Sequence, residues 1–130
     1  MEPNQVFLER WNHMFHQKDF KQLADLLAPD CVLISPIVHK PYRERQQILA
    51  ILQAVTRALP DFTYVQQEVF PRGAMLVFRG KMDEMELEGI DLFELSADGL
   101  VQKLTVMVRP FKATMMFAER MSKELEHAQY

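Results

Sequence analysis

The spacing of apolar residues divides the sequence into a mostly helical first part and a strand-rich second part. Apolar side chains recur every three or four positions in four segments, which predicts helices over residues 4–17, 19–28, 43–59 and 111–127. Asn4 is the expected N-cap of the first helix. β-Branched and apolar residues predict strands over residues 31–39, 62–70, 75–82, 85–95 and 100–109. Turn-forming residues separate the last four strands, so we expect an antiparallel meander.

The order of these elements is typical of an α+β protein. A chain of 130 residues has room for one domain, which here spans residues 1–130. We expect a cone-like, strongly curved, mostly antiparallel sheet that wraps around the N-terminal helices, with a further helix at the C-terminal end. Pro36 predicts a bulge or an edge position for the first strand. A sheet of this shape would leave a conical cavity beside the helices.

Asp91 is the most informative polar residue, because it lies on a strand face that is otherwise apolar. Alternation puts Leu87, Gly89, Asp91, Phe93 and Leu95 on one face, whereas the glutamates of this segment tend to the other. Burying an unpaired carboxylate costs on the order of several kcal/mol, so Asp91 should be hydrogen-bonded, paired with a cation, or protonated with a raised pKa. Two interpretations stay open: a carboxyl group facing a ligand cavity, or a structural one held by tyrosine or backbone donors.

Composition and charge exclude several classes of function. The formal charge of −3 and the calculated isoelectric point of about 5.8 give no basic surface for nucleic acid. No segment approaches the roughly 20 apolar residues of a membrane span, and the start lacks a signal-peptide pattern. We therefore expect a cytoplasmic protein that binds neither nucleic acid nor membranes. Because the sequence has neither a glycine-rich phosphate loop nor a nucleophile elbow, we do not expect a nucleotide or a covalent-serine mechanism, and we expect no cofactor. His13 and His16 lack the spacing and the third ligand of a zinc site, so we expect no metal.

Three segments resemble a known family in their order and spacing. They are QKDF followed by LLAPDCV within residues 17–32, EGIDLFEL followed by DGLV within residues 88–101, and VRPF at residues 108–111. Together they resemble SnoaL-like proteins of the nuclear transport factor 2-like superfamily, over almost the whole chain. The resemblance implies the curved sheet with its cavity. The superfamily includes polyketide cyclases, ketosteroid isomerases, epoxide hydrolases, dehydratases and members without catalysis, so it does not choose a reaction.

The catalytic positions of those relatives are only partly matched. In ketosteroid isomerase a catalytic Asp precedes a proline in the first strand, whereas here Ser35 precedes Pro36 and cannot act as a carboxylate base. The first-helix Tyr of the isomerase falls near Trp11, which has no hydroxyl group. Asp91 resembles the protonated Asp of the isomerase's oxyanion hole. The Asp-Arg-Asp set of epoxide hydrolases has no convincing counterpart.

Alternation and resemblance together give the candidate site residues. Asp91 and His39 are the candidate catalytic residues, because a His at the rim of a pocket can carry a proton to or from a carboxyl group. An exposed loop position is the alternative for His39, and an ordinary core is the alternative for the aromatic residues. The candidate ligand-binding residues are Trp11, Phe15, Ser35, Ile37, Phe62, Phe78, Met82, Phe93 and Met107.

Two functions from different classes fit these residues. One is a protein whose apolar pocket binds a small hydrophobic molecule without a complete catalytic set, which Ser35 in place of a base favours. The other is an acid–base enzyme, of isomerase, cyclase or dehydratase type, acting on a steroid-like or polyketide-like carbonyl compound. We also expect a homodimer through the sheet, because one face is more apolar than a solvated surface requires. Its apolar residues are Val65, Val69, Met75, Val77, Thr105 and Met107.

Overall fold

The computed structural model describes residues 2–126, which form four helices and five strands. In chain order they are α1 (Pro3–Gln17), α2 (Phe20–Leu26), β1 (Leu27–Ile34), α3 (Arg45–Ala58), β2 (Thr63–Phe70), β3 (Gly73–Met82), β4 (Met85–Leu95), β5 (Val101–Arg109) and α4 (Phe111–Glu126). This order confirms the predicted α+β class. The predicted end of the last helix, His127, lies outside the described residues.

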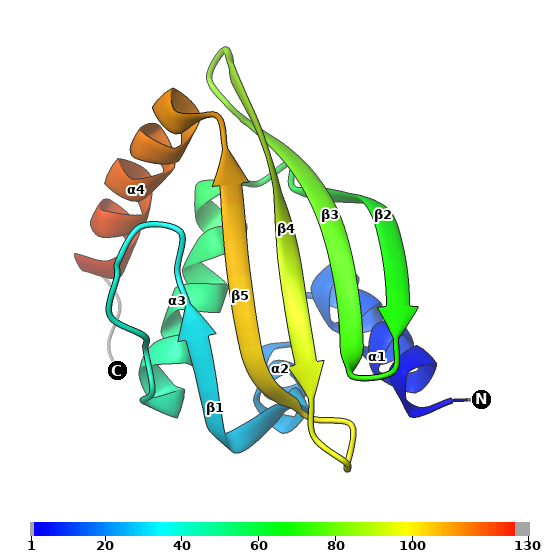
Figure 1. The fold of residues 1–130 in the computed structure, drawn as a ribbon. Helices are drawn as coiled ribbons and strands as arrows, with labels where there is room; N and C mark the ends of the chain where they lie inside the picture. Colours follow the sequence, from blue (N-terminus) through cyan, green and yellow to red (C-terminus); the bar gives the residue numbers. More distant parts are fainter. Residues whose placement is uncertain (1, 127–130) are drawn as a thin grey trace.

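The strands form one sheet in the order β1-β5-β4-β3-β2 (Figure 1). Strands β2 to β5 pair antiparallel with their sequence neighbours, which confirms the predicted meander. Strand β1 lies at the edge, as Pro36 predicted, and pairs in parallel with β5. That parallel pair joins segments far apart in the sequence, so no short-range turn signal could have announced it.

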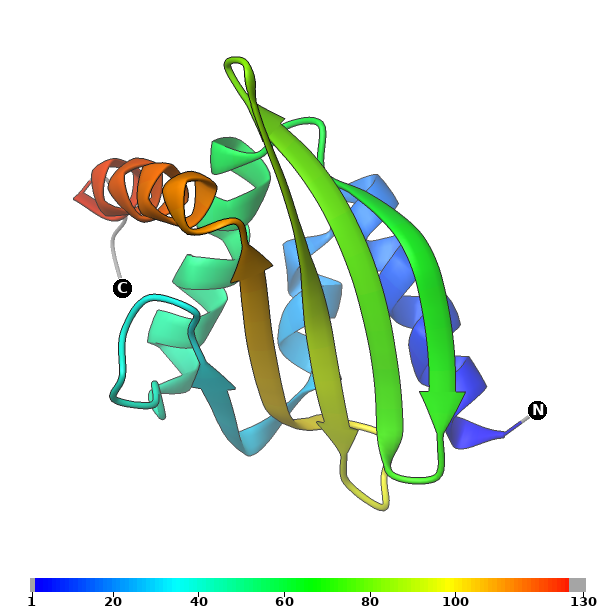
Figure 2. The same cartoon turned by 45° about the horizontal axis from the view of Figure 1, so that its top comes forward.

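The helices gather on one face of the sheet, which we call the inner face. Figures 1 and 2 show α1, α2 and α3 behind the curved sheet, while α4 packs against α3 near the edge formed by β1 and β5. Inner-face side chains such as Leu76, Phe93 and Leu104 are buried, whereas Arg79 and Lys103 on the outer face are exposed. This one-sided cover agrees with the alternation of apolar and polar residues along the strands.

Local polar groups explain two differences from the predicted elements. Strand β1 starts at Leu27 and ends at Ile34, because the Ser35 hydroxyl oxygen then accepts the N–H groups of Ile37 and Val38 and turns the chain (3.0 and 3.3 Å). The prediction of Asn4 as N-cap is wrong. Its side chain instead donates to the carbonyl oxygen of Phe70, which ties α1 to the end of β2.

A bulge in β2 changes which of its residues face inward. The register against β3 shifts between Tyr64 and Gln66, so Val65 is left half exposed and Val69 turns to the inner face. The prediction that Val69 belongs to the apolar outer face is therefore wrong, because one inserted residue reverses the alternation.

Two clusters of buried side chains fill the space under the sheet. The α1–α2 cluster includes Phe7, Trp11, Leu23, Leu26 and Phe93. The α3–α4 cluster includes Ala54, Ala58, Phe78, Met82, Ala113, Phe117 and Met121. The candidate site lies where these two clusters meet.

Candidate functional site

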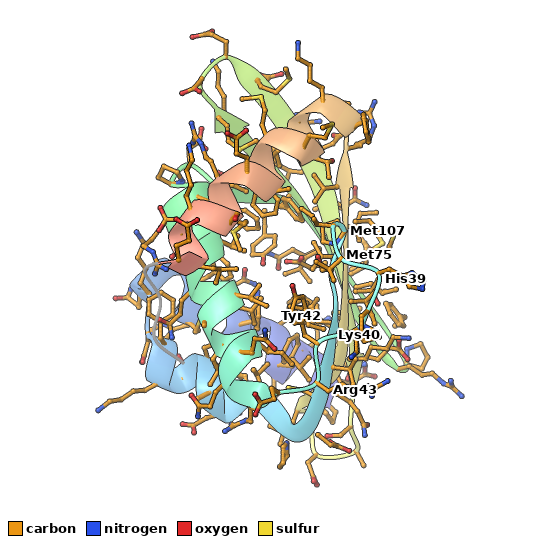
Figure 3. The ribbon with its side chains drawn as sticks, turned by 90° about the vertical axis from the view of Figure 1, so that its left-hand side faces the viewer. His39, Lys40, Tyr42, Arg43, Met75 and Met107 are labelled. Carbon is orange, nitrogen blue, oxygen red and sulfur yellow. The ribbon has the colours of Figure 1, made fainter. Side chains whose placement is uncertain are left out.

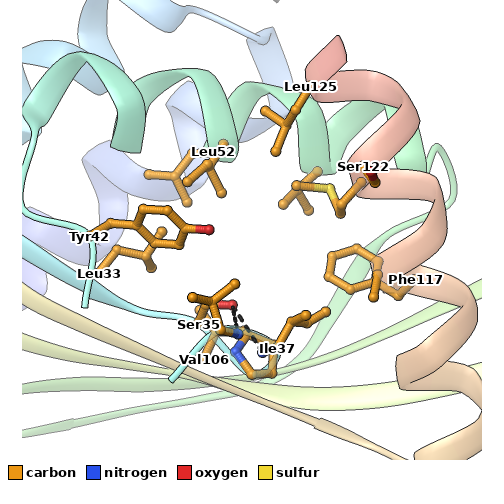
Figure 4. Close-up of a pocket in the computed structure, with 15 residues that line it drawn as sticks. Leu33, Ser35, Ile37, Tyr42, Leu52, Val106, Phe117, Ser122 and Leu125 are labelled. Atoms are coloured by element: carbon orange, nitrogen blue, oxygen red, sulfur yellow. Dashed lines mark hydrogen bonds between the residues drawn. The ribbon is translucent and has the colours of Figure 1, made fainter. Parts of the chain in front are cut away.

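Two adjoining cavities run from the protein surface to Asp91. The outer cavity has a volume of about 300 Å³ and opens between α4 and the loop that follows β1 (Figure 4). The inner cavity is much smaller, at about 40 Å³, and Asp91 lies in its wall. The two cavities share Leu52, Val55, Val106 and Phe117 as wall residues, so these four side chains lie between them.

Asp91 is held at the inner end by a chain of hydrogen bonds. Its side chain points to the inner face from the middle of β4, between Leu76 of β3 and Val106 of β5. The Tyr64 hydroxyl group donates to Asp91 Oδ2 at 2.9 Å, and Trp11 Nε1 donates to the Tyr64 oxygen at 2.9 Å. Tyr64 is not a wall residue of either cavity, so its hydrogen bond holds the carboxyl group from the protein interior.

Burial sets the protonation of Asp91. Desolvation raises the pKa of the carboxyl group from 3.8 to about 7, and the hydrogen bond from Tyr64 acts in the opposite direction. Burial also raises the pKa of Tyr64, and the nearby Asp91 charge raises it further. Near neutral pH, Asp91 is therefore divided between its acid and its carboxylate, while Tyr64 stays a hydrogen-bond donor.

One oxygen of Asp91 has no hydrogen-bond partner among the described residues. Within residues 2–126, Oδ2 has Tyr64 as its partner whereas Oδ1 has no hydrogen bond, although the residue is only 7% exposed. A neutral carboxyl group can donate from Oδ1 to a carbonyl or hydroxyl oxygen, and a carboxylate can accept from a hydroxyl group. The inner end of the cavity therefore suits an uncharged polar group.

Stacked aromatic rings form the wall beside Asp91. Phe62 stacks on Phe78 with ring centres 4.7 Å apart, and Phe15 stacks on Phe62 at 5.3 Å. Gly89 makes room for this wall, since a Cβ atom there would lie 2.4 Å from Phe78 Cζ and 2.3 Å from the Met107 carbonyl oxygen. The glycine thus leaves the space beside β4 that the Phe78 ring occupies.

The structure brings most of the sequence-predicted residues to these cavities. Trp11, Phe15, Phe62, Phe78 and Asp91 line the inner cavity. Ser35 and Ile37 line the outer cavity near its mouth.

Four predicted residues lie elsewhere. His39 is exposed in the loop after β1 and points away from the helices, and Met107 lies on the outer face (Figure 3). Met82 and Phe93 are on the inner face but are enclosed by their own clusters, where Phe93 packs against Trp11 with ring centres 4.7 Å apart. The alternation of β1 does not reach His39, because the strand already ends at Ile34.

Two tyrosines were missed by the sequence analysis. Tyr64 binds Asp91, and a buried acid on an inner face signals the need for such a donor without saying which residue supplies it. Tyr42 lines the outer cavity. It lies outside any strand that periodicity predicts, and only a single pairing with Leu33 of β1 brings it under the sheet.

The described residues contain neither a metal-binding cluster nor a helix that could span a membrane. Between residues 2 and 126, no three His, Cys, Asp or Glu side chains are grouped in a way that could hold a metal ion. No helix in this part of the chain has the length and the apolar character needed to cross a membrane.

Comparison with known proteins gives the family. The SnoaL-like domain family matches the sequence over residues 8–104. The chain belongs to this family. No curated protein sequence matches the chain at a significant level.

Solved structures similar to this SnoaL-like protein share its nuclear transport factor 2-like fold. A steroid delta-isomerase from Pseudomonas aeruginosa has 32% sequence identity and a TM-score of 0.91, with 97% of this chain and 93% of that chain covered. An uncharacterized protein with a cystatin-like fold from Silicibacter pomeroyi has 25% identity and a TM-score of 0.86, covering 93% and 86%. A nuclear transport factor 2-like protein of unknown function from Mesorhizobium loti has 21% identity and a TM-score of 0.72, covering 83% and 92%.

Proposed function

We propose that this SnoaL-like protein binds a small, mainly apolar molecule whose oxygen atom contacts Asp91. The observation that carries the proposal is the position of Asp91, a buried carboxyl group in the wall of an apolar cavity, with one oxygen that has no hydrogen-bond partner among the described residues. Among residues 2–126, the walls of both cavities contain no charged residue other than Asp91, which favours an uncharged ligand. Ser35 in the outer wall offers no base, which supports binding over a complete catalytic set.

The pH dependence of binding tests this proposal. A ketone accepts a hydrogen bond only from protonated Asp91, and with a pKa of about 7 its affinity should fall about tenfold from pH 6 to pH 8. A thermal-shift screen with a steroid ketone, an aromatic ketone and a fatty acid identifies a probe, because a ligand that prefers the native state raises its stability. Titrations of that probe then give the affinity at each pH.

The Asp91→Asn variant is the matched control. Asparagine keeps the shape, can accept from Tyr64 and cannot titrate, so its affinity for the same ketone should not change with pH. A wild-type affinity that is independent of pH, or that rises from pH 6 to pH 8, would contradict the proposed role of Asp91.

An acid–base enzyme is the second candidate. It is favoured by the pKa of Asp91 of about 7, which suits proton transfer at neutral pH, and by the 32% identity to a structure described as a steroid delta-isomerase. The test is deuterium uptake from D₂O at the carbon atom next to the carbonyl group of a bound ketone. Exchange in the wild type that is lost in Asp91→Asn supports the enzyme; equal exchange in both argues against it.

We also propose that the chain forms a homodimer through the outer face of the sheet. Two rows of side chains, Met75-Leu92-Thr105 and Val77-Ile90-Met107, cross the strands there. Charged side chains at either end of the rows already form pairs within the chain, such as Arg109 with Glu88 at 2.7 Å and Lys103 with Glu94 at 3.8 Å. An apolar patch with a neutralised rim can meet a second copy of itself without opposing like charges.

Sedimentation measures this assembly directly. The wild type should sediment at twice its mass of 15.3 kDa, and Met107→Glu should give monomers because Met107 belongs to the patch and is 46% exposed. Met115→Glu is the control, since this Met is 58% exposed on α4 and away from the patch. A monomeric wild type at micromolar concentration would overturn the dimer.

A further inference from the structure

Tyr42 is placed under the sheet by its backbone. Its N–H donates to the Leu33 carbonyl oxygen at 2.9 Å and its carbonyl oxygen accepts from Leu33 N–H at 3.0 Å. Directly paired residues point to the same face, and Leu33 is buried on the inner face. Tyr42 therefore points inward although it lies in the connection between β1 and α3, whereas His39 in the same loop points outward (Figure 3).

The Tyr42 hydroxyl group points into the empty part of the outer cavity (Figure 4). No described residue forms a hydrogen bond with it, in contrast to the Tyr64 hydroxyl group, which has two partners. A tyrosine in an apolar site normally uses its hydroxyl group as a polar contact. Since no residue between 2 and 126 provides that contact, the hydroxyl group is open to solvent or to a ligand.

The remaining polar groups of the outer wall are less suited to a ligand. Ser35 already accepts two backbone N–H groups of its own loop. Ser122 is exposed on α4 at the mouth. Tyr42 is thus the polar group in the described wall that is both directed inward and uncommitted.

Tyr42 and Asp91 line different cavities, with apolar side chains between them. Asp91 lines the inner cavity and not the outer one, while Tyr42 lines the outer cavity and not the inner one. Leu52, Val55, Val106 and Phe117 lie in the walls of both. A molecule that enters through the outer cavity and reaches Asp91 contacts these four apolar side chains, and its outer end lies in the cavity that Tyr42 lines.

We propose that Tyr42 is a specificity-determining residue and that the ligand is an uncharged, elongated molecule with two oxygen-containing groups, one bound by Asp91 and the other by the Tyr42 hydroxyl group. The inference rests on the proposed function, because it assumes that Asp91 receives the first group. It defines the ligand class further: a ketone with a second hydroxyl or carbonyl group at its far end, separated by an apolar ring system or chain.

A pair of probes with the Tyr42→Phe variant tests this inference. The probes are an acetylnaphthalene and its derivative with a hydroxyl group on the far ring, and fluorescence titration measures both affinities. Phenylalanine keeps the ring and removes only the hydroxyl group. Tyr42→Phe should weaken binding of the hydroxylated probe about two- to tenfold, the effect of one neutral hydrogen bond, and leave the simpler probe unchanged.

The outcomes separate this inference from the proposed function. If the wild type binds neither probe, the proposed function fails and the role of Tyr42 fails with it. If the wild type binds both, and Tyr42→Phe changes the two affinities equally or not at all, only the role of Tyr42 is overturned. Ser122→Ala is the control: a selective loss in this variant instead of in Tyr42→Phe would move the second contact to α4 and also overturn the inference.

Discussion

The two clusters under the sheet use the same strands but differ in how completely they are packed. In the α1–α2 cluster, Phe93 meets Phe7 and Trp11 with ring centres 5.0 and 4.7 Å apart, and all three are at most 1% exposed. The α3–α4 cluster, by contrast, includes three small buried residues, Ala54, Ala58 and Ala113. Large rings close one end of the molecule, whereas the other end keeps a cavity.

The complete packing of the first cluster supports the chemistry of the second. Trp11 belongs to the α1–α2 cluster and reaches Asp91 in the cavity wall through Tyr64. A hydrogen-bonded group anchored in close-packed surroundings has little freedom to reorient. Asp91 can therefore present Oδ1 to the cavity without collapsing onto other polar groups.

Truncating one ring in each cluster gives the largest expected contrast. Phe93→Ala should lower the free energy of unfolding by about 3–5 kcal/mol, because it leaves a hole among tightly packed side chains. Phe117→Ala should cost at least about 1 kcal/mol less, because part of the Phe117 surface already faces the cavities. Urea denaturation of both variants measures the difference. Equal losses would mean that the two ends of the core are packed alike.

Titration of Asp91 gives the next largest effect. The pKa of Asp91 is about 7 in the native state and 3.8 when the carboxyl group is not buried, as in the unfolded chain. Between these pH values the native state therefore binds more protons than the unfolded state. The stabilisation that the protonated Asp91 contributes to the native state is complete below pH 3.8 and is lost as the pH rises through about 7. The difference of about three pKa units corresponds to about 4 kcal/mol of unfolding free energy.

The Asp91→Asn variant isolates this contribution. Its stability relative to the wild type should increase steadily from pH 4 to pH 7 and level off above, since only the wild type must carry a buried carboxylate there. Denaturant unfolding at several pH values measures the change. If the stability of Asp91→Asn relative to the wild type instead decreases from pH 4 to pH 7, the Asp91 carboxylate is stabilised by its surroundings, as in a structural ion pair.

The sequence predicted the fold more fully than the site, for physical reasons. Periodicity located the meander and the inward direction of Asp91, because alternation is a local property of a strand. It could not place Tyr42, which depends on one pairing with Leu33, and it extended the first strand to His39 because Ser35 ends that strand by a side-chain hydrogen bond. Val69 was assigned to the wrong face because the bulge in β2 leaves no clear mark in the sequence.

Removing the hydroxyl group of Tyr64 or of Tyr42 should have the smallest effect on stability. The two variants compare a tyrosine that faces the protein interior with one that faces the cavity. Tyr64→Phe leaves the buried Trp11 Nε1 without its acceptor, so it should cost about 1–3 kcal/mol of unfolding free energy. It should also raise the pKa of Asp91 further, because the hydrogen bond from Tyr64 is the interaction that lowers it.

Tyr42→Phe breaks no hydrogen bond within the described residues and should leave the unfolding free energy and the pKa of Asp91 nearly unchanged. Chemical denaturation and NMR titration of the Asp91 carboxyl carbon measure the two effects. A Tyr64→Phe variant as stable as Tyr42→Phe, with an unchanged Asp91 titration, would mean that the chain from Trp11 to Asp91 does not hold the carboxyl group.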